Sequence, residues 1–205
     1  KAVCECNPGW ASEDCSLTTE VFRQRVELRE KIIINVLASI STGWSLCVNS
    51  EQDLKMLVST TSGLVSNADE LTSTTQQQIL DLIADISTST QFINTESAQG
   101  FTNILSSLAS GFDQQQSHIY SLYGQSAQNQ KTQQFFTVID NVLNGLLASK
   151  VQGDPASNIR SRNVILYAQR NTQKSYEGQY VFVAEGSEVF IPPGIKFQNV
   201  QPTDD

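Results

Sequence analysis

The first three quarters of the chain place apolar residues at helical spacing. Between Leu17 and about Lys150 they recur every three or four positions, the period that turns one face of an α-helix toward a core. The first stripe predicts an amphipathic helix of about twenty residues that stops near Gly43. Its apolar positions are Phe22, Val26, Ile33, Leu37 and Ile40.

A second and a third helix are predicted next. The second runs from about Ser50 to Val65, and Ser50 suits its N-cap because a serine hydroxyl accepts a hydrogen bond from an amide of the first turn. The third begins near Thr72 and carries its apolar stripe through Ile86. The polar stretch 124–134 suits either an exposed helix or a loop. Later helical stripes lie at 101–112, 119–123 and 135–147.

The character of the chain changes at Gly153-Asp154-Pro155. Gly and Pro end the helical pattern, and β-branched and aromatic residues follow. Strands are predicted at 163–170, 179–184 and 188–191, and Glu185-Gly186-Ser187 suits a hairpin loop between the last two. Helices followed by antiparallel strands predict an α+β fold, in which a helical bundle-like block precedes the start of a β-domain.

The charge of the chain limits its partners. It has 13 Lys and Arg residues against 21 Asp and Glu residues, a formal net charge of -8. Nucleic acid is therefore not an expected partner, because binding to its backbone requires clustered basic side chains. No apolar run approaches the ~20 residues that cross a bilayer, so we expect no direct membrane insertion by this segment. The chain opens at Lys1 without an initiator Met or a signal peptide, which we interpret as an internal fragment.

Residues that could carry catalysis show no recognisable arrangement. His118 is the sole histidine, no Gly-x-Ser-x-Gly elbow accompanies it, and nothing in its spacing from Cys47 supports a thiol-imidazole pair. Asp81 and Asp85 stand one helical turn apart, but without a histidine partner they suit a solvated face better than a metal or glycosidase site. We therefore expect no enzymatic activity, no catalytic, cofactor-binding or metal-binding residues, and no cofactor.

The other charged candidates comprise three acidic residues and a small basic group. Asp53, Asp69 and Glu70 are spread over helix faces. A small basic group around the first strand forms a solvated rim, with an acidic partner surface as the alternative. That group is Arg160, Arg162, Arg170 and Lys174.

The cysteines are concentrated at the start of the chain. Cys4, Cys6 and Cys15 lie within the first fifteen residues, and Cys47 stands apart. This density predicts disulfides and therefore a chain outside the cytosol. Zinc is the alternative, although Cys-x-Cys followed after eight residues by Cys lacks the paired Cys-x-x-Cys motifs of a tetrahedral site. Cys47 suits a buried free thiol, or a bond to Cys4 or to another part of the whole protein.

The run from Cys4 to Cys15 resembles the C-terminal half of an epidermal growth factor-like (EGF-like) module. That family has the pattern Cys-x-Cys-x-x-Gly-aromatic-x-Gly-x-x-Cys, and only its second Gly is replaced, by Ser12. The resemblance implies that Cys6 bonds Cys15 and that Cys4 pairs with a cysteine upstream of the chain. The turn sequence Asn7-Pro8-Gly9, which allows the chain to double back, agrees with that pairing.

The cysteine-rich run, a Ser/Thr-rich helical block and the 153–155 break into strands follow one another directly. This order is similar to the extracellular stalks of polycystin-like proteins and adhesion receptors. Those stalks carry a GAIN domain, a helical subdomain followed by a β-sandwich, often beside a receptor-for-egg-jelly (REJ) region. The matching segments are 69–86 and 142–155, and the likeness covers 17–197. No His-Leu-Ser or His-Leu-Thr tripeptide occurs, so the self-cleavage of that family is not implied here.

These patterns predict three parts: 1–16 as the C-terminal half of an EGF-like module, 17–152 as a helical subdomain, and 153–205 as the start of a β-sandwich subdomain with its tail. We expect an internal part of a large extracellular structural or adhesive protein, acting as an interaction and spacer module. Its expected partners are other modules or chains of the same assembly, with a homo-oligomer or filament as one form. The expected location is extracellular or the cell surface, with a ciliary or flagellar membrane as a candidate. The alternative is the stalk of a membrane signalling receptor or of a polycystin-like channel protein.

Overall fold

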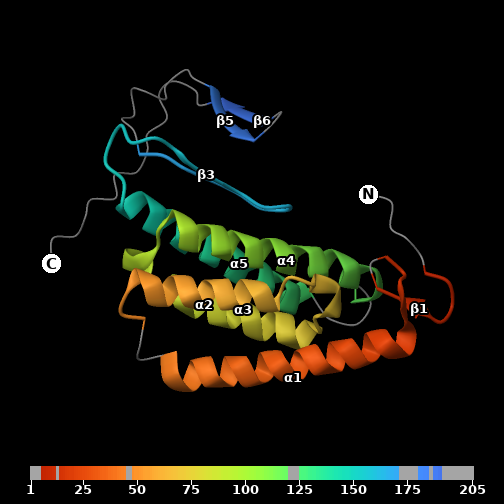
Figure 1. Ribbon diagram of the computed structural model, residues 1–205. Coiled ribbons are helices and arrows are strands. Elements are labelled where there is room, and N and C mark those ends of the chain that lie inside the picture. The colour runs from red at the N-terminus through yellow and green to blue at the C-terminus, as the bar shows by residue number, and fades with distance from the viewer. Residues whose placement is uncertain are drawn as a thin grey trace.

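A short strand pair and a block of long helices precede β-hairpins in the chain (Figure 1). The computed structural model describes residues 6–12, 14–44, 48–119, 125–170, 180–184 and 187–190. The predicted α+β class is confirmed. The elements are β1 (Trp10–Ala11), β2 (Leu17–Thr18), α1 (Thr19–Trp44), α2 (Glu51–Leu64), η1 (Ala68–Glu70), α3 (Ser73–Ser87), η2 (Thr90–Phe92), α4 (Thr95–Ile119), α5 (Gln125–Ala148), β3 (Ser157–Arg160), β4 (Ile165–Ala168), β5 (Tyr180–Ala184) and β6 (Ser187–Phe190).

The starts of the helices follow from capping side chains. The hydroxyl of Ser50 accepts a hydrogen bond from the amide of Asp53, as predicted for the N-cap of α2. Thr72 caps α3 in the same way. The side chain of Asn94, which the apolar stripes do not indicate, accepts hydrogen bonds from two amides of the first turn of α4. The polar stretch 124–134, for which helix and loop were the two alternatives, is helical from Gln125 onward.

The hydrophobic core lies among α2, α3, α4 and α5, with α2 packed on α4 and α3 on α5. Two of the contacts between these elements are close because a glycine lies at the point of contact. A Cβ on Gly145 would lie 2.6 Å from Cβ of Ile93 and 2.8 Å from the carbonyl oxygen of Thr90, so α5 could not rest on η2 with a larger residue there. A Cβ on Gly100 would overlap Cγ1 of Val58, which limits the contact of α4 with α2.

Helix α1 occupies an outer layer below α2 and α3 (Figure 1). Only Ile33 is fully buried among its side chains at positions 19–39. Val36 and Leu37 pack on the core but stay partly exposed. The predicted first helix is therefore present, but it starts after the short strand β2, and its positions 19–39 add little apolar surface to the core.

The β3–β4 hairpin covers α4 and α5 on the side opposite α1 (Figure 1). Four of its residues, Ile159, Val164, Leu166 and Ala168, belong to the same buried cluster as the helices. The predicted division at 152 and 153 stays a prediction, but the core runs across it. Strand β3 is absent from the predicted strands because Ile159 is its only apolar residue.

The last hairpin agrees with its prediction in position and pairing. Tyr180 pairs with Phe190 and Val181 with Val189 in an antiparallel register. Strand β6 begins at Ser187, one residue earlier than expected, because Ser187 pairs with Ala184.

Candidate functional site

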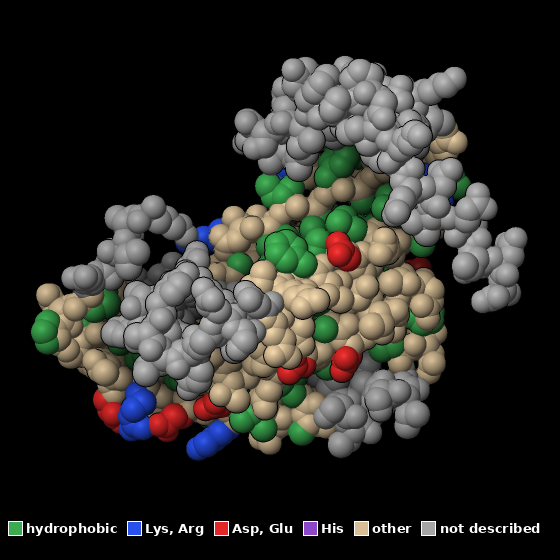
Figure 2. Space-filling view, turned by 180° about the vertical axis from the view of Figure 1, so that it is seen from behind, with side chains coloured by type: hydrophobic (Ala, Val, Ile, Leu, Met, Phe, Trp, Pro, Cys, Tyr) green, Lys and Arg blue, Asp and Glu red, His purple; other side chains and the backbone are tan. Residues whose placement is uncertain are grey.

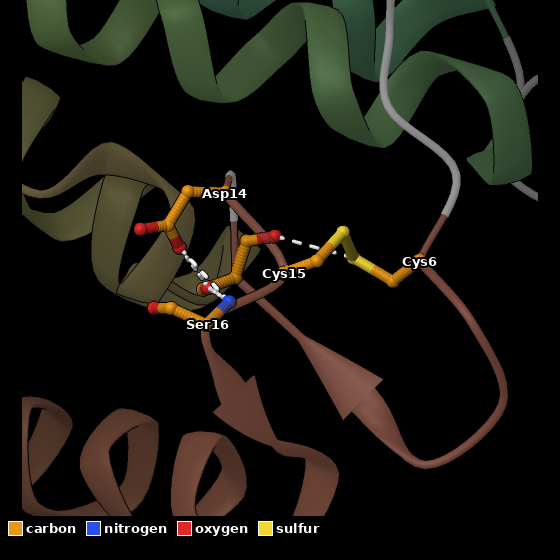
Figure 3. The surroundings of a disulfide bond; sticks show 5 residues. Cys6, Asp14, Cys15 and Ser16 are labelled. Carbon is orange, nitrogen blue, oxygen red and sulfur yellow. Dashed lines mark hydrogen bonds between the residues drawn. A yellow bond between two sulfur atoms is a disulfide. The ribbon is translucent and has the colours of Figure 1, made fainter.

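The N-terminal module is closed by a disulfide between Cys6 and Cys15, the pair that the EGF-like resemblance implies (Figure 3). The Asn7-Pro8-Gly9 turn is present, with the amide of Trp10 donating to the carbonyl of Asn7 at 3.0 Å. Zinc binding would require these two sulfurs as thiolates, and the bond between them removes that form.

Ser12 stands where the EGF-like pattern has its second glycine, and it adopts a positive φ of 82°. Its hydroxyl donates to Oδ1 of Asp14 at 2.6 Å, and the amide of Ser16 donates to the same carboxyl oxygen at 3.2 Å (Figure 3). These bonds, led by the one from Ser12, lower the pKa of Asp14 to about 2. The hydrogen bonds hold the loop in a conformation that glycine adopts at lower cost.

The module joins α1 without an intervening linker. Thr18 pairs with Trp10 in the β1–β2 ladder, and the next residue, Thr19, is the first of α1. The amide of Thr19 donates to the carbonyl of Gly9 at 3.0 Å, and the hydroxyl of Thr18 accepts from the amide of Val21 at 3.4 Å. The direction of α1 is therefore fixed relative to the disulfide loop.

A second junction holds the middle of α1 on the α2–α3 connector, which we define as residues 65–72. Nε of Arg29 lies 2.6 Å from Oε2 of Glu70, and its Nη1 donates to the carbonyl of Leu64 at 3.0 Å. Arg25 lies 3.8 Å from the other oxygen of Glu70. A cation at Leu64 also suits the negative end of the α2 dipole, because Leu64 is the last residue of that helix.

The next residue of α1 contacts the start of α3. Oε1 of Glu30 accepts a hydrogen bond from the hydroxyl of Thr72 at 2.9 Å and lies 3.5 Å from the hydroxyl of Thr75. A carboxylate beside the N-terminus of α3 is electrostatically favourable. Adjacent residues of opposite charge on α1 thus meet the opposite ends of two helices. We call this set the α1 clasp; it comprises Arg25, Arg29 and Glu30 on α1 with Leu64, Glu70, Thr72 and Thr75.

Glu70, one of the acidic residues that the sequence spreads over helix faces, is buried in the clasp. Its residue exposure is only 6 %, because two arginines of α1 cover it. Burial of a carboxylate is tolerated when it is paired and hydrogen-bonded. Arg29 is 41 residues away from Glu70, so periodicity within one helix carries no sign of the contact.

Amide and hydroxyl side chains connect the other helices. Nε2 of Gln77 donates to the side-chain oxygen of Gln134 at 2.8 Å, and Nε2 of Gln134 donates to Asp81 at 2.9 Å. The exposed Asp81 therefore joins α3 to α5. Lys131 donates to the hydroxyl of Ser73 at 3.1 Å, and desolvation lowers the pKa of this ammonium group.

The remaining candidate residues are placed only in part. Cys4 and Cys47 lie outside the described residues, so the alternatives for their partners stay open. His118 belongs to α4, but its side chain is outside the described part of the chain. Within the described ranges, no cluster of three or more His, Cys, Asp or Glu side chains is suited to a metal ion.

Charged side chains are unevenly distributed over the face that Figure 2 shows. They gather mainly at its lower left edge, and a few others lie elsewhere on this face. The first half of α1 contributes exposed Glu20, Arg23 and Glu27, and Arg23 bridges both carboxylates. Among the described residues no helix is long and apolar enough to span a bilayer.

Comparison with known proteins identifies no relative: no protein family, no curated protein and no solved structure matches the chain. The EGF-like and GAIN-like resemblances therefore stay predictions that rest on the residues quoted for them.

Proposed function

We propose that the chain is an interaction and spacer module of a large extracellular structural or adhesive protein. The observation that carries the proposal is the direct junction between the disulfide module and α1. Thr18 ends the β1–β2 ladder, and Thr19 begins a helix of 26 residues, which extends for about 39 Å. A spacer must fix the direction of the next module, and a continuous junction does so whereas a flexible linker does not.

The chemistry of the chain supports the same proposal. Small domains outside the cytosol use disulfides where they are too small to bury a core, which is the situation of residues 6–18. We place the protein outside the cell or on its surface, with other modules or chains of the same assembly as partners and with no role for nucleic acid or a catalytic site.

Limited proteolysis tests the rigidity of the junction. We expect the segment 18–197 to remain largely intact under conditions that cleave accessible loops. The matched control is Cys6→Ser/Cys15→Ser, in which the loop is open and cleavage near Glu20 should appear. Rapid cleavage near Glu20 in the oxidised wild-type chain would contradict a rigid spacer.

Surface labelling tests the location. A membrane-impermeant biotin reagent applied to intact cells should label the natural protein, and non-reducing peptide mapping should recover a Cys6–Cys15 peptide that separates with reductant. Labelling only after lysis, or free thiols at both positions in native material, would refute the extracellular assignment.

A further inference from the structure

Helix α1 differs from the other helices in how it is held. Ile33 is its one fully buried side chain at positions 19–39, whereas α4 buries Phe101, Ile104 and Leu105 completely. Leu28 and Ile32 of α1 remain 61 % and 46 % exposed. Burial of apolar surface is the main force that keeps helices packed, so over positions 19–39 the attachment of α1 depends more on polar contacts than that of α4.

The polar contacts between α1 and the α2–α3 connector at described positions form the α1 clasp. When α1 leaves the body, water can hydrate Glu70, Thr72 and the carbonyl of Leu64, which lie at helix ends and not inside the apolar core. Exchange of a protein hydrogen bond for one with water costs less than exposure of several packed apolar side chains, such as the three that α4 buries completely. Separation at the clasp is therefore easier than separation of α4 from its neighbours.

We propose that α1 is a releasable helix: it separates from the α2–α5 body as a unit, with the disulfide module still attached, and the clasp controls how often this happens. The module stays with α1 because Thr18 and Thr19 bond Trp10 and Gly9 of the disulfide loop. Release exposes Ile33. Tension between neighbouring modules could pull α1 away from the body, and this role of the opening rests on the proposed spacer function. The opening itself does not depend on that function.

The order of charges in the clasp gives a specific test. Arg29→Glu/Glu30→Arg keeps the composition and net charge of α1, yet it places a carboxylate against Glu70 and a guanidinium beside the N-terminus of α3. The matched control is Arg23→Glu/Glu27→Arg. It swaps a pair that lies within α1, with side chains 56 % and 50 % exposed.

Native-state hydrogen exchange on the oxidised 205-residue chain measures the opening. In the wild type, amides at positions 26–37 should exchange at least about tenfold faster than those at 101–108, because α1 opens without global unfolding. The clasp variant should raise exchange in α1 by about a further tenfold and leave α4 within about twofold. The control should change α1 by less than about threefold.

Equal exchange of α1 and α4 in the wild type would overturn the proposal, and this comparison does not require the variant to fold. The proposal is also wrong if the clasp variant leaves exchange in α1 unchanged, or if the control raises it as much. These measurements use the isolated chain, so a failed surface-labelling experiment refutes the proposed function without affecting the release of α1.

Discussion

At the scale of single residues, the left-handed loop at Ser12 shows how hydrogen bonds offset backbone strain. A non-glycine residue with φ of 82° is disfavoured by contacts of its Cβ. The Ser12 hydroxyl lies between Asp14, to which it donates, and the amide of Ser16, from which it accepts. The replacement of glycine in the EGF-like pattern therefore introduces both a strained conformation and the bonds that hold it.

The pKa of Asp14 provides a test of this loop. Its carboxyl should titrate by NMR with a midpoint of about 2, below the usual 3.8, because Ser12 and Ser16 donate to the ionised form. Ser12→Ala should move the midpoint upward, whereas Ser39→Ala, whose hydroxyl bonds within α1, should not. Because the pKa of Asp14 is lower in the folded than in the unfolded state, its ionisation stabilises the loop at pH values above the unfolded pKa. This contribution is lost as the pH falls toward 2. An unshifted midpoint in the wild type would contradict these bonds.

Thr61 offers a second prediction at this scale. This residue is 1 % exposed, and its Oγ1 has no hydrogen-bond partner among the described groups. Thr61→Val keeps the shape and removes a buried hydroxyl, so the free energy of unfolding should rise by about 1 kcal/mol. The control is Thr102→Val, where Oγ1 donates to the carbonyl of Ala98 at 2.7 Å and no gain is expected. Denaturant unfolding that shows a loss for Thr61→Val would indicate a bonded hydroxyl.

At the scale of elements, the predictable features are those encoded by neighbouring residues. The apolar stripes, the Ser50 cap and the β5–β6 hairpin all depend on short spacings, and the sequence indicates each of them. Strand β3 is different, because Ile159 alone suggests burial and the strand exists through its pairing with β4. The α1 clasp joins residues far apart in the chain, so only its separate charges are visible in the sequence.

Gly145 provides a prediction about helix packing. Gly145→Ala puts a methyl group against Ile93 and the carbonyl of Thr90, and since a backbone atom cannot move aside cheaply, the free energy of unfolding should fall by about 1–3 kcal/mol. Gly63→Ala is the matched control: nothing lies within 4 Å of its Cβ, and alanine favours the helix by up to about 1 kcal/mol. The midpoint temperatures of thermal unfolding of the two variants should therefore shift in opposite directions. A neutral Gly145→Ala would mean that α5 and η2 are not in close contact.

At the scale of the whole molecule, helices α2 to α5 and the β3–β4 hairpin share one hydrophobic core. The β3–β4 hairpin is docked by polar as well as apolar contacts: the amide of Asn163 donates to Oγ of Ser106 at 3.0 Å, and Gln99 donates to the carbonyl of Arg160 at 3.0 Å. In the described part of the chain few ion pairs join elements apart from the clasp, one being Lys55 with Glu96 between α2 and α4, so cohesion there depends mainly on shape and hydrogen bonding. Such contacts are less sensitive to salt than surface ion pairs.

Truncation tests whether this body extends past the predicted subdomain boundary at 152. A chain ending at Lys150 loses Ile159, Val164 and Leu166 from the core, which should lower the free energy of unfolding by roughly 5 kcal/mol. That loss is comparable to the total stability of many domains, so the 1–150 chain should lose its cooperative transition. A chain ending at Arg170 keeps the hairpin and should unfold cooperatively near the wild-type temperature. If both truncated chains unfold alike, the hairpin contributes no stability, and the helical part is stable without it, in keeping with the predicted helical subdomain at 17–152.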